Sequence, residues 1–332
     1  MNIEAFHKDM IIWDAHRDVA YEAPIEERFL QRWTVGVDMH LPIVRRGGID
    51  VQVYAIAVAT TLDLPPTVQA LKELEIVLTI LESNNHETML ATNISEVQRA
   101  MKEGKLAVIL SMEGGEPILS ELGLIRMFYR LGFRSIGLTW NFRNAIADGG
   151  YEGEEGGGLS KFGRDVVKEM NRLGMLIDVA HMTDKGILDV LKVSDAPVIL
   201  SHGTTRALRP GHHRAYKNAI LEAIANNKGV FCVTTIPEAL SVDPNQATLS
   251  HFIDHVEQAI SVMGEDYVGL GSDFDVYRSH LGLPPERWLK NLEEADKLPN
   301  VTASLLERGY SERVIRKIMG ENLFRLYNEV IG

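Results

Sequence analysis

The chain has 332 residues, of which 45% are hydrophobic and 24% charged, a composition typical of a globular protein with enough apolar material for a large core. Its formal net charge of -12 argues against nucleic acid or an anionic membrane surface as a partner. The single cysteine, Cys232, excludes an intrachain disulfide and a thiolate metal cluster, and it indicates a reducing compartment.

Apolar runs rich in β-branched residues alternate with stretches of helical periodicity from one end of the chain to the other. Several runs are apolar on both faces, as parallel strands covered by helices are. The predicted strands are Met10–His16, Val51–Thr60, Leu106–Glu113, Ser135–Trp140, Leu176–His181, Val198–His202, Gly229–Thr235 and Tyr267–Asp273.

Amphipathic segments separate these strands, and a strand followed by a helix eight times over predicts a (β/α)8 TIM barrel. We expect residues 1–332 to form one domain. A further helix over Ser311–Val330, with Ser311 as its N-cap, would pack on the barrel exterior or close its floor. The main predicted helices are Pro66–Ser83, Ser120–Leu131, Lys161–Leu173, Asp184–Val193, Lys217–Asn226 and Leu249–Met263.

A doubly wound open sheet is the competing architecture. Such sheets usually carry a glycine-rich phosphate loop after the first strand, whereas here that strand leads into HRDVAYEAP. The segment Gly149–Gly158 (GGYEGEEGGG) follows the fourth predicted strand, where barrels place active-site loops. It is either a lid over the site or a mobile surface loop.

Five residues of metal-ligand type stand at the C-terminal ends of predicted strands: His16, Asp18, Glu113, His181 and His202. Any one of them could be an ordinary polar residue at a strand end, so the indication lies in their coincidence. His16 and Asp18 are two positions apart and therefore point the same way from a strand. Barrel enzymes carry their chemistry at this end of the strands, so we expect all five side chains to converge.

Three imidazoles and two carboxylates suit a divalent ion such as Zn²⁺, and five ligands exceed what one tetrahedral site with an open position uses. We therefore predict two zinc ions bridged by Glu113, the first also held by His16 and Asp18 and the second by His181 and His202. Two ions about 3.5–4 Å apart can share a hydroxide, lower the pKa of its parent water toward about 7 and polarise a carbonyl group. This arrangement predicts a binuclear metallohydrolase.

Three further residues complete the predicted site. Asp273 ends the last strand and is favoured as the proton-transferring acid/base, whereas Asp275 fits an N-cap of the following segment at least as well. Arg214, in the loop after the sixth strand, could bind a substrate carboxylate or be a surface arginine. Trp140 ends the fourth strand and would be either an apolar wall of the substrate pocket or a core aromatic.

The remaining histidines are expected to have no part in the chemistry. His212 and His213 lie beside Arg214 in a predicted loop, where solvated imidazoles are the ordinary case. The others lack a strand-end position and are expected on the surface or in packing; they are His40, His251, His255 and His280.

With these motifs in place, the chain resembles the membrane (renal) dipeptidase family, zinc dipeptidases among the amidohydrolase-like barrels. The matching segments, in order, are WDAHRD, SMEGGEPI, LTWN, LIDVAHM, PVILSHGTTRAL, VGLGSDFD and GENLFRLY. The His-Arg-Asp of the first segment is this family's variant of the His-x-His found in most amidohydrolases. The resemblance implies a bridging Glu113, a catalytic Asp273, and an arginine after the sixth strand that binds the C-terminal carboxylate of a dipeptide.

One position departs from the vertebrate-type members, which carry a histidine that binds the scissile carbonyl where this chain has Trp140. An indole N–H can donate a hydrogen bond but cannot take up a proton, and tryptophan here resembles a bacterial-type branch. We therefore expect a zinc dipeptidase that accepts small dipeptides, including those with a C-terminal D-residue.

Two other functions stay open. Trp140 also suits a related amidohydrolase acting on N-acyl amino acids, cyclic amides or lactones. The other is a non-catalytic barrel that binds a small molecule or a partner. Such a barrel would be expected to lack a metal ligand or the acid/base, whereas the five metal-ligand candidates and Asp273 are all present. The N-terminus lacks the pattern of a signal peptide, and no apolar run approaches the roughly 20 residues of a membrane span, so we expect a cytoplasmic protein. The resemblance further suggests a homodimer.

Overall fold

The computed structural model describes residues 2–19, 41–58, 64–274 and 288–332. His40, Asp275, His280 and the end of the predicted strand Val51–Thr60 lie outside these ranges.

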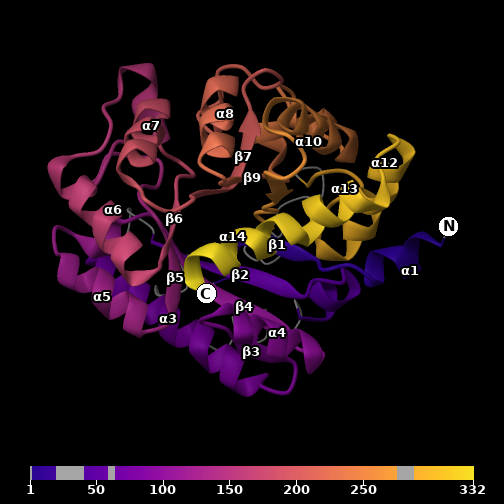
Figure 1. Ribbon diagram of the computed structural model, residues 1–332, viewed down its shortest axis with the longest axis horizontal. Helices are drawn as coiled ribbons and strands as arrows, with labels where there is room; N and C mark the ends of the chain where they lie inside the picture. The colour runs from indigo at the N-terminus through magenta and orange to yellow at the C-terminus, as the bar shows by residue number, and fades with distance from the viewer. Residues whose placement is uncertain (1, 20–40, 59–63, 275–287) are drawn as a thin grey trace.

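A closed barrel of parallel strands forms the centre of the molecule, with helices around it (Figure 1). Its strands are β1 (Trp13–Asp18), β2 (Val51–Ala57), β4 (Leu106–Glu113), β5 (Phe133–Gly137), β6 (Leu176–Asp178), β7 (Ile199–Thr205), β9 (Val230–Val233) and β10 (Val268–Leu270). Each strand pairs with the next in this order, and β10 pairs with β1 to close the ring. Every predicted strand overlaps one of them, although β1 and β7 run past the predicted ends and β5 begins two residues earlier than predicted, so the predicted TIM barrel is confirmed.

Two short strands lie outside the ring and were not expected from the sequence. Strand β3 (Thr88–Leu90) pairs with β4, and β8 (Ala215–Tyr216) pairs with β7. The helices are α1 (Ile3–Lys8), α3 (Pro66–Ser83), α4 (Ile94–Lys102), α5 (Leu122–Arg130), α6 (Lys161–Leu173), α7 (Asp184–Val193), α8 (Asn218–Asn226), α9 (Pro237–Leu240), α10 (Leu249–Met263), α12 (Leu298–Glu307), α13 (Glu312–Arg316) and α14 (Asn322–Ile331). In the described ranges, no helix is both long and apolar enough to traverse a bilayer.

Local chemistry sets the helix ends. Helix α6 begins after Ser160, whose hydroxyl accepts a hydrogen bond from the Gly163 N–H, and it ends at Gly174 in the left-handed conformation with φ 70°. Helix α3 starts with proline at its first position, where the missing N–H costs no hydrogen bond. These signals explain why the bounds of both helices match the prediction.

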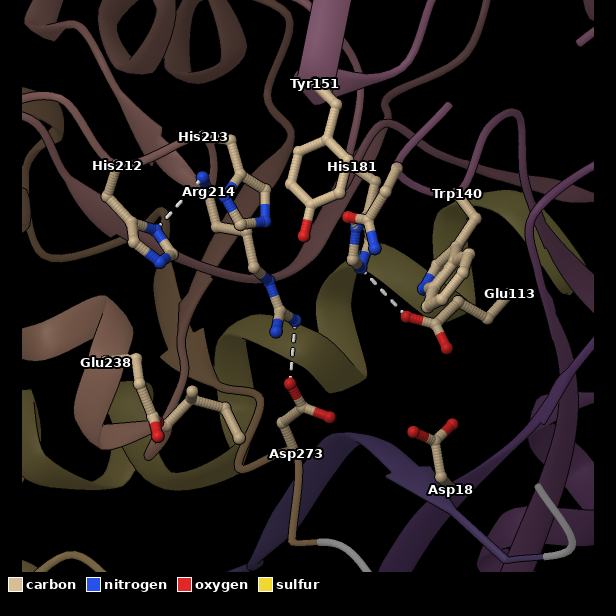
Figure 2. A pocket seen from close by; sticks show the side chains of 12 residues that line it. Asp18, Glu113, Trp140, Tyr151, His181, His212, His213, Arg214, Glu238 and Asp273 are labelled. Carbon is tan, nitrogen blue, oxygen red and sulfur yellow. Dashed lines mark hydrogen bonds and ion pairs between the residues drawn. The ribbon is translucent and has the colours of Figure 1, made fainter. Parts of the chain in front are cut away.

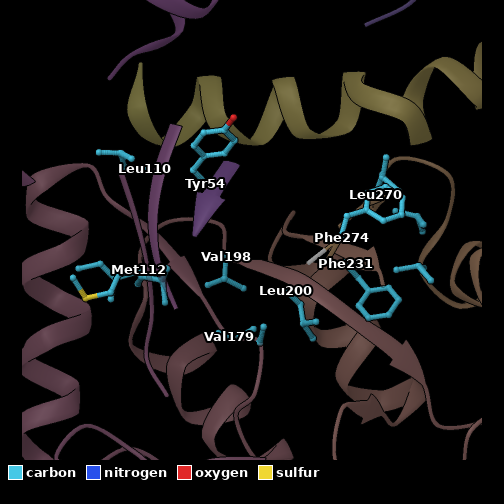
Figure 3. Close-up of a cluster of buried hydrophobic side chains, with 14 of the residues drawn as sticks. Tyr54, Leu110, Met112, Val179, Val198, Leu200, Phe231, Leu270 and Phe274 are labelled. Carbon is cyan, nitrogen blue, oxygen red and sulfur yellow. The ribbon is translucent and has the colours of Figure 1, made fainter. Parts of the chain in front are cut away.

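Alternation along the strands sends side chains to two different cores. On β4, Leu110 and Met112 face outward and join the large apolar cluster between barrel and helices, together with residues such as Leu200 and Phe231 (Figure 3). Ala107 and Ile109 of the same strand face inward and fill the barrel interior. The inner cluster occupies the N-terminal half of the strands, so the C-terminal half is left for polar side chains.

The C-terminal segment closes the floor of the barrel, one of the two positions expected for it. Helix α14 lies across the ring of strands (Figure 1), and its Leu323 and Tyr327 join the inner cluster, with the Tyr327 ring 4.8 Å from that of Trp13. The predicted helix is confirmed over Glu312–Ile331, with Ser311 as its N-cap, but a π-helical turn, Lys317–Glu321, lies within it between α13 and α14. Gly320 in this turn approaches the Ile11 carbonyl so closely that a Cβ would lie 2.3 Å from the oxygen.

Candidate metal centre

The five predicted ligands meet at the C-terminal mouth of the barrel. Nε2 of His16 lies 3.6 Å from Oδ1 of Asp18 and 3.7 Å from Oε1 of Glu113. The same Glu113 oxygen lies 2.9 Å from Nε2 of His181 and 3.3 Å from Nε2 of His202. One carboxylate oxygen therefore stands among all three imidazoles.

Two β-bulges bring His16 and His202 to the inner face. In the register of β1 against β2, Asp14 pairs with Gln52 and Arg17 with Tyr54, so Ala15 and His16 together stand opposite one residue. The extra residue changes the phase of alternation, which is how a bulge redirects side chains.

The β1 bulge lets Trp13 fill the barrel floor while Asp18, an odd number of positions away, also faces inward. The same shift occurs in β7 between Leu200 and Gly203. It lets Ile199 join the inner core while His202 reaches the mouth.

Backbone strain marks two residues of the mouth. His181 has φ 64° and Asp273 has φ 59°, conformations that residues with a side chain seldom adopt. Their N–H groups are held in place, that of His181 by the Tyr216 hydroxyl at 2.9 Å and that of Asp273 by the His16 carbonyl at 3.1 Å. The surrounding structure therefore fixes both side chains as they leave their strands.

Neighbouring polar groups orient the two downstream imidazoles. Nδ1 of His181 lies 2.9 Å from Oδ1 of Asn141, an acceptor, so Nδ1 carries the proton and Nε2 presents its lone pair. Oγ of Ser201 lies 2.8 Å from Nδ1 of His202. The two Nε2 atoms come within 2.7 Å of each other beside Glu113, so both imidazoles face the same point.

The electrostatics of the cluster show buried negative charge in excess. Burial by itself lowers the pKa of His16, but Glu113 and Asp18 outweigh it and raise that pKa to about 10. Burial and the charge of Glu113 raise the pKa of Asp18. Burial lowers the pKa values of His181 and His202 well below the usual range, which keeps both imidazoles in the neutral form that binds metals.

The cluster fits a bound cation. Within the part of the chain that the structure describes, Nε2 of His16 and Oδ1 of Asp18 are buried without a hydrogen-bond partner. Ligand atoms of His16, Glu113 and His202 lie within 4.8 Å of one another, and so do those of His16, Asp18 and Asp273. Both unpaired atoms thus point into a centre lined by oxygen and imidazole nitrogen, the donors that divalent ions take.

Asp273 and Arg214 flank this centre. Oδ1 of Asp273 lies 3.8 Å from Nε2 of His16, and its Oδ2 accepts a hydrogen bond of 2.7 Å from Nη2 of Arg214 (Figure 2). Arg214 is partly buried, and its guanidinium reaches the site from the stretch between β7 and β8. The structure therefore brings both predicted residues to the same cavity.

A cavity of about 310 Å³ opens over the centre, and Trp140 forms part of its wall (Figure 2). The cavity also includes residues that sequence reasoning did not assign to the site: Asn141, Tyr151, His212, His213, Ile236 and Glu238. His212 and His213, expected to be solvated loop residues, are partly buried and line this cavity. Burial lowers their pKa values to about 3 and about 4, so both rings are neutral near pH 7. In the sequence, only their position next to Arg214 indicated that these two histidines could belong to the site.

The glycine-rich segment is tied to the site. It forms a short 3-10 turn, Gly150–Glu155, and the Gly150 N–H donates to the His181 carbonyl at 2.6 Å. Near its end, the Gly157 N–H donates to the carboxylate of Asp148 at 2.5 Å. The turn carries Tyr151 into the wall of the cavity.

Two named relatives share sequence with this chain. Dipeptidase tcpJ of Claviceps purpurea (strain 20.1) is 36% identical over 260 residues, which cover 78% of this chain and 59% of the relative. Dipeptidase verJ of Clonostachys rogersoniana is 34% identical over 262 residues, which cover 78% of this chain and 64% of the relative. The chain thus spans less than two-thirds of the length of either protein.

A solved structure agrees in fold over almost the whole length. The metallopeptidase dipeptidase AC superposes with a TM-score of 0.82 and 25% identity, covering 97% of this chain and 99% of that one. The sequence profile described as Membrane dipeptidase (Peptidase family M19) matches residues 1–331. On the strength of that match, this chain belongs to the membrane dipeptidase family.

Proposed function

We propose that this chain is a metal-dependent dipeptidase whose centre holds two divalent ions, most simply Zn²⁺, within one domain spanning residues 1–332. The observation that carries the proposal is the position of Glu113 Oε1, within 3.7 Å of Nε2 of His16, His181 and His202. A carboxylate so placed can serve two ions at once.

In this scheme His16, Asp18 and Glu113 hold one ion, while Glu113, His181 and His202 hold the other. Imidazole and carboxylate ligands suit zinc, although the same set also accepts other divalent transition metals. When bound, such a pair supplies a water of lowered pKa and polarises the carbonyl of the substrate.

Asp273 is the proposed acid/base. Its Oδ1 faces His16 at 3.8 Å, beside the centre, while Oδ2 is held by Arg214, so the carboxylate has a fixed orientation. It takes a proton from the attacking water and delivers it to the leaving amine, the role of a positioned acid/base group.

Arg214 is the proposed anchor for the C-terminal carboxylate of the substrate, and Trp140 the proposed apolar wall. A guanidinium can bind a carboxylate with two parallel hydrogen bonds, which fixes the distance from carboxylate to scissile bond. The cavity of about 310 Å³ is at the small end of ligand sites, which span roughly 300–1,000 Å³, and this favours two-residue substrates. Because the anchor is the carboxylate, the proposal includes dipeptides whose second residue has the D configuration.

The test is hydrolysis of a dipeptide panel, with L,L and L,D members, by purified protein loaded with zinc. Metal analysis of the same sample should find about two equivalents of divalent ion. We expect release of free amino acids from dipeptides and none from tripeptides. A fully loaded protein that cleaves no member of the panel would refute the proposal.

The second candidate keeps the metals and changes the substrate to an N-acyl amino acid, a cyclic amide or a lactone. It is favoured by Trp140, whose large apolar face forms the cavity wall and suits an acyl group as well as a side chain. The same loaded protein assayed on those compounds decides between the two, by the ratio of their kcat/KM values.

The cytoplasmic location and the homodimer stay predictions from the sequence. Light scattering of the purified protein tests the second, with a mass of twice 37.1 kDa expected.

A further inference from the structure

Tyr151 stands at the mouth of the cavity with its hydroxyl turned inward. Figure 2 shows the phenol oxygen pointing from the 3-10 turn Gly150–Glu155 toward the space between Arg214 and His181. The residue is 53% exposed, yet Tyr151 lines the same cavity as Glu113 and Asp273. A polar group is therefore presented where a substrate would lie.

Aromatic neighbours hold the ring in this direction. Phe142 contacts it edge-on with centroids 5.2 Å apart, and His213 does so with centroids 4.4 Å apart. Rings in such edge-to-face contact stabilise each other beyond their buried area. The hydroxyl is thus directed by packing on two sides.

Backbone hydrogen bonds fix Tyr151 relative to the metal centre. The Tyr151 N–H donates to the Asn141 carbonyl at 2.9 Å, and the preceding Gly150 N–H donates to the His181 carbonyl at 2.6 Å. The side chain of Asn141 also accepts from the His181 imidazole at 2.9 Å. Asn141 therefore positions both Tyr151, through its carbonyl, and the proposed metal ligand His181, through its side chain.

A donor of this kind has a role in the proposed reaction. When water attacks an amide, the C=O electron pair moves onto the carbonyl oxygen, and hydrogen-bond donors aimed at that oxygen lower the barrier. In the proposed scheme the ions held by Asp18 and Glu113 polarise this oxygen, and a hydrogen-bond donor at the mouth adds to that stabilisation. Arg214 is engaged with Asp273 at 2.7 Å.

Resting on the proposed function, we infer that the Tyr151 hydroxyl donates a hydrogen bond to the oxygen of the scissile amide as it becomes negative. The attacking water gives its proton to Asp273 as its oxygen bonds to the carbonyl carbon. Collapse re-forms the C=O bond, breaks the C–N bond and passes the proton from Asp273 to the leaving nitrogen. Tyr151 keeps its own proton throughout.

The test begins with Tyr151→Phe, which removes the hydroxyl and keeps the ring between Phe142 and His213. We expect kcat to fall by about 10²-fold, the effect of losing one such donor, with KM changed by no more than about twofold. Tyr310→Phe, between α12 and α13 and outside the lining of the cavity, is the matched control and should keep the parent kcat.

Binding measurements separate this role from a structural one. A phosphinate dipeptide analogue has anionic oxygens that imitate the attacked carbonyl. Calorimetry on the zinc-loaded proteins should show that Tyr151→Phe binds this analogue about 10²-fold more weakly than the parent does. A reduced-amide analogue, in which CH₂ replaces the C=O, should bind both proteins equally.

Two outcomes overturn the inference alone: an unchanged kcat and phosphinate affinity in Tyr151→Phe, or an equal loss of affinity for both analogues. If the parent protein hydrolyses no dipeptide, the proposed function is refuted, and the inference that rests on it is refuted as well.

Discussion

Arg214 donates a hydrogen bond of 2.7 Å from Nη2 to Oδ2 of Asp273, joining the proposed substrate anchor to the proposed acid/base. The two residues come from separate parts of the chain, one between β7 and β8 and the other just after β10. Asp273 contributes to raising the pKa of Arg214 despite its burial. A substrate carboxylate bound by Arg214 therefore arrives next to the group that handles the proton.

This pairing leads to a prediction for Arg214→Lys, which keeps the charge but loses the planar pair of donors. We expect kcat/KM for dipeptides to fall by about 10–100-fold, since the loss of one charged hydrogen bond is worth roughly 1.5–3 kcal/mol. Dipeptide amides, which lack the carboxylate, serve as the control substrates. The parent protein should prefer the free acid, and an equal loss on acid and amide in the variant would contradict the anchoring role.

Asp273→Asn removes the proton acceptor while keeping the shape of the side chain. We expect kcat to fall by about 10²–10⁴-fold, the usual contribution of a general acid/base. Metal content and the melting temperature should stay close to those of the parent, and both are measured on the same preparation. A variant that retains more than about a tenth of the parent kcat would assign the proton transfer elsewhere.

Glu113 and His16 should differ in their effect on metal content. Glu113→Gln weakens the ligand proposed to be shared, so we expect both ions to be lost together during dialysis against chelator. His16→Ala touches one proposed ion and should leave about one equivalent in place. Mass spectrometric metal analysis measures both, with exposed His86→Ala as control. Stepwise, independent loss in both variants would argue against the bridge.

Asn141→Leu tests the orientation of His181. Without the acceptor 2.9 Å from Nδ1, the imidazole loses its preferred tautomer and ring angle. Partners of this kind affect metal affinity by about 10–100-fold, and we expect a loss of that size in a competition titration with a chelator. Asn171→Leu, at a site remote from the cavity, is the matched control. Parent-like affinity in Asn141→Leu would mean that the rigid backbone alone positions His181.

His255, which is not a proposed metal ligand, leads to a prediction about how the stability of the fold depends on pH. Its Nδ1 accepts from the Thr205 N–H at 3.1 Å, so the neutral ring donates from Nε2 to the Leu240 carbonyl, also at 3.1 Å. Protonation of Nδ1 would place the new N–H of His255 against the N–H of Thr205, so the neutral ring is favoured. Burial lowers the pKa of His255 to about 4, from an ordinary value of 6.5, although the hydrogen bond to the Leu240 carbonyl acts in the opposite direction.

The sign follows from proton linkage. Above pH 6.5 the ring is neutral in the folded and unfolded chain, and His255 adds no pH dependence. Between pH 6.5 and 4 only the unfolded chain takes up the proton. The free energy of unfolding therefore decreases as the pH is lowered, by about 3 kcal/mol over the interval. Urea unfolding of the parent and of His255→Asn, which keeps an acceptor for Thr205, measures the difference. Identical pH slopes in the two proteins would show that His255 does not titrate this way.

The sequence identified most of the barrel because its signals are local. Strands buried on both faces read as continuous apolar runs, and helix ends carry their own caps, as Ser160 and Gly174 do for α6. The π-helical turn at Lys317–Glu321 was missed because its cause is distant: Gly320 packs against Ile11 at the other end of the chain.

Residues on loops were harder to assign. Tyr151, His212 and His213 carry no periodic pattern, and their positions depend on contacts with one another and with Phe142. Placement at a strand end was a usable signal for His181, since every strand of a parallel barrel points its C-terminus toward the same mouth.

The order of residues along the chain was sufficient to determine the fold class and the identity of the candidate ligands, because hydrophobic periodicity and strand-end position are properties of neighbouring residues. Only the tertiary structure decided that Glu113 Oε1 stands among three imidazoles, that bulges turn His16 and His202 inward, and that Arg214 meets Asp273. Those contacts join side chains whose separation depends on strand register and barrel closure, and these are set by the packing of the whole chain.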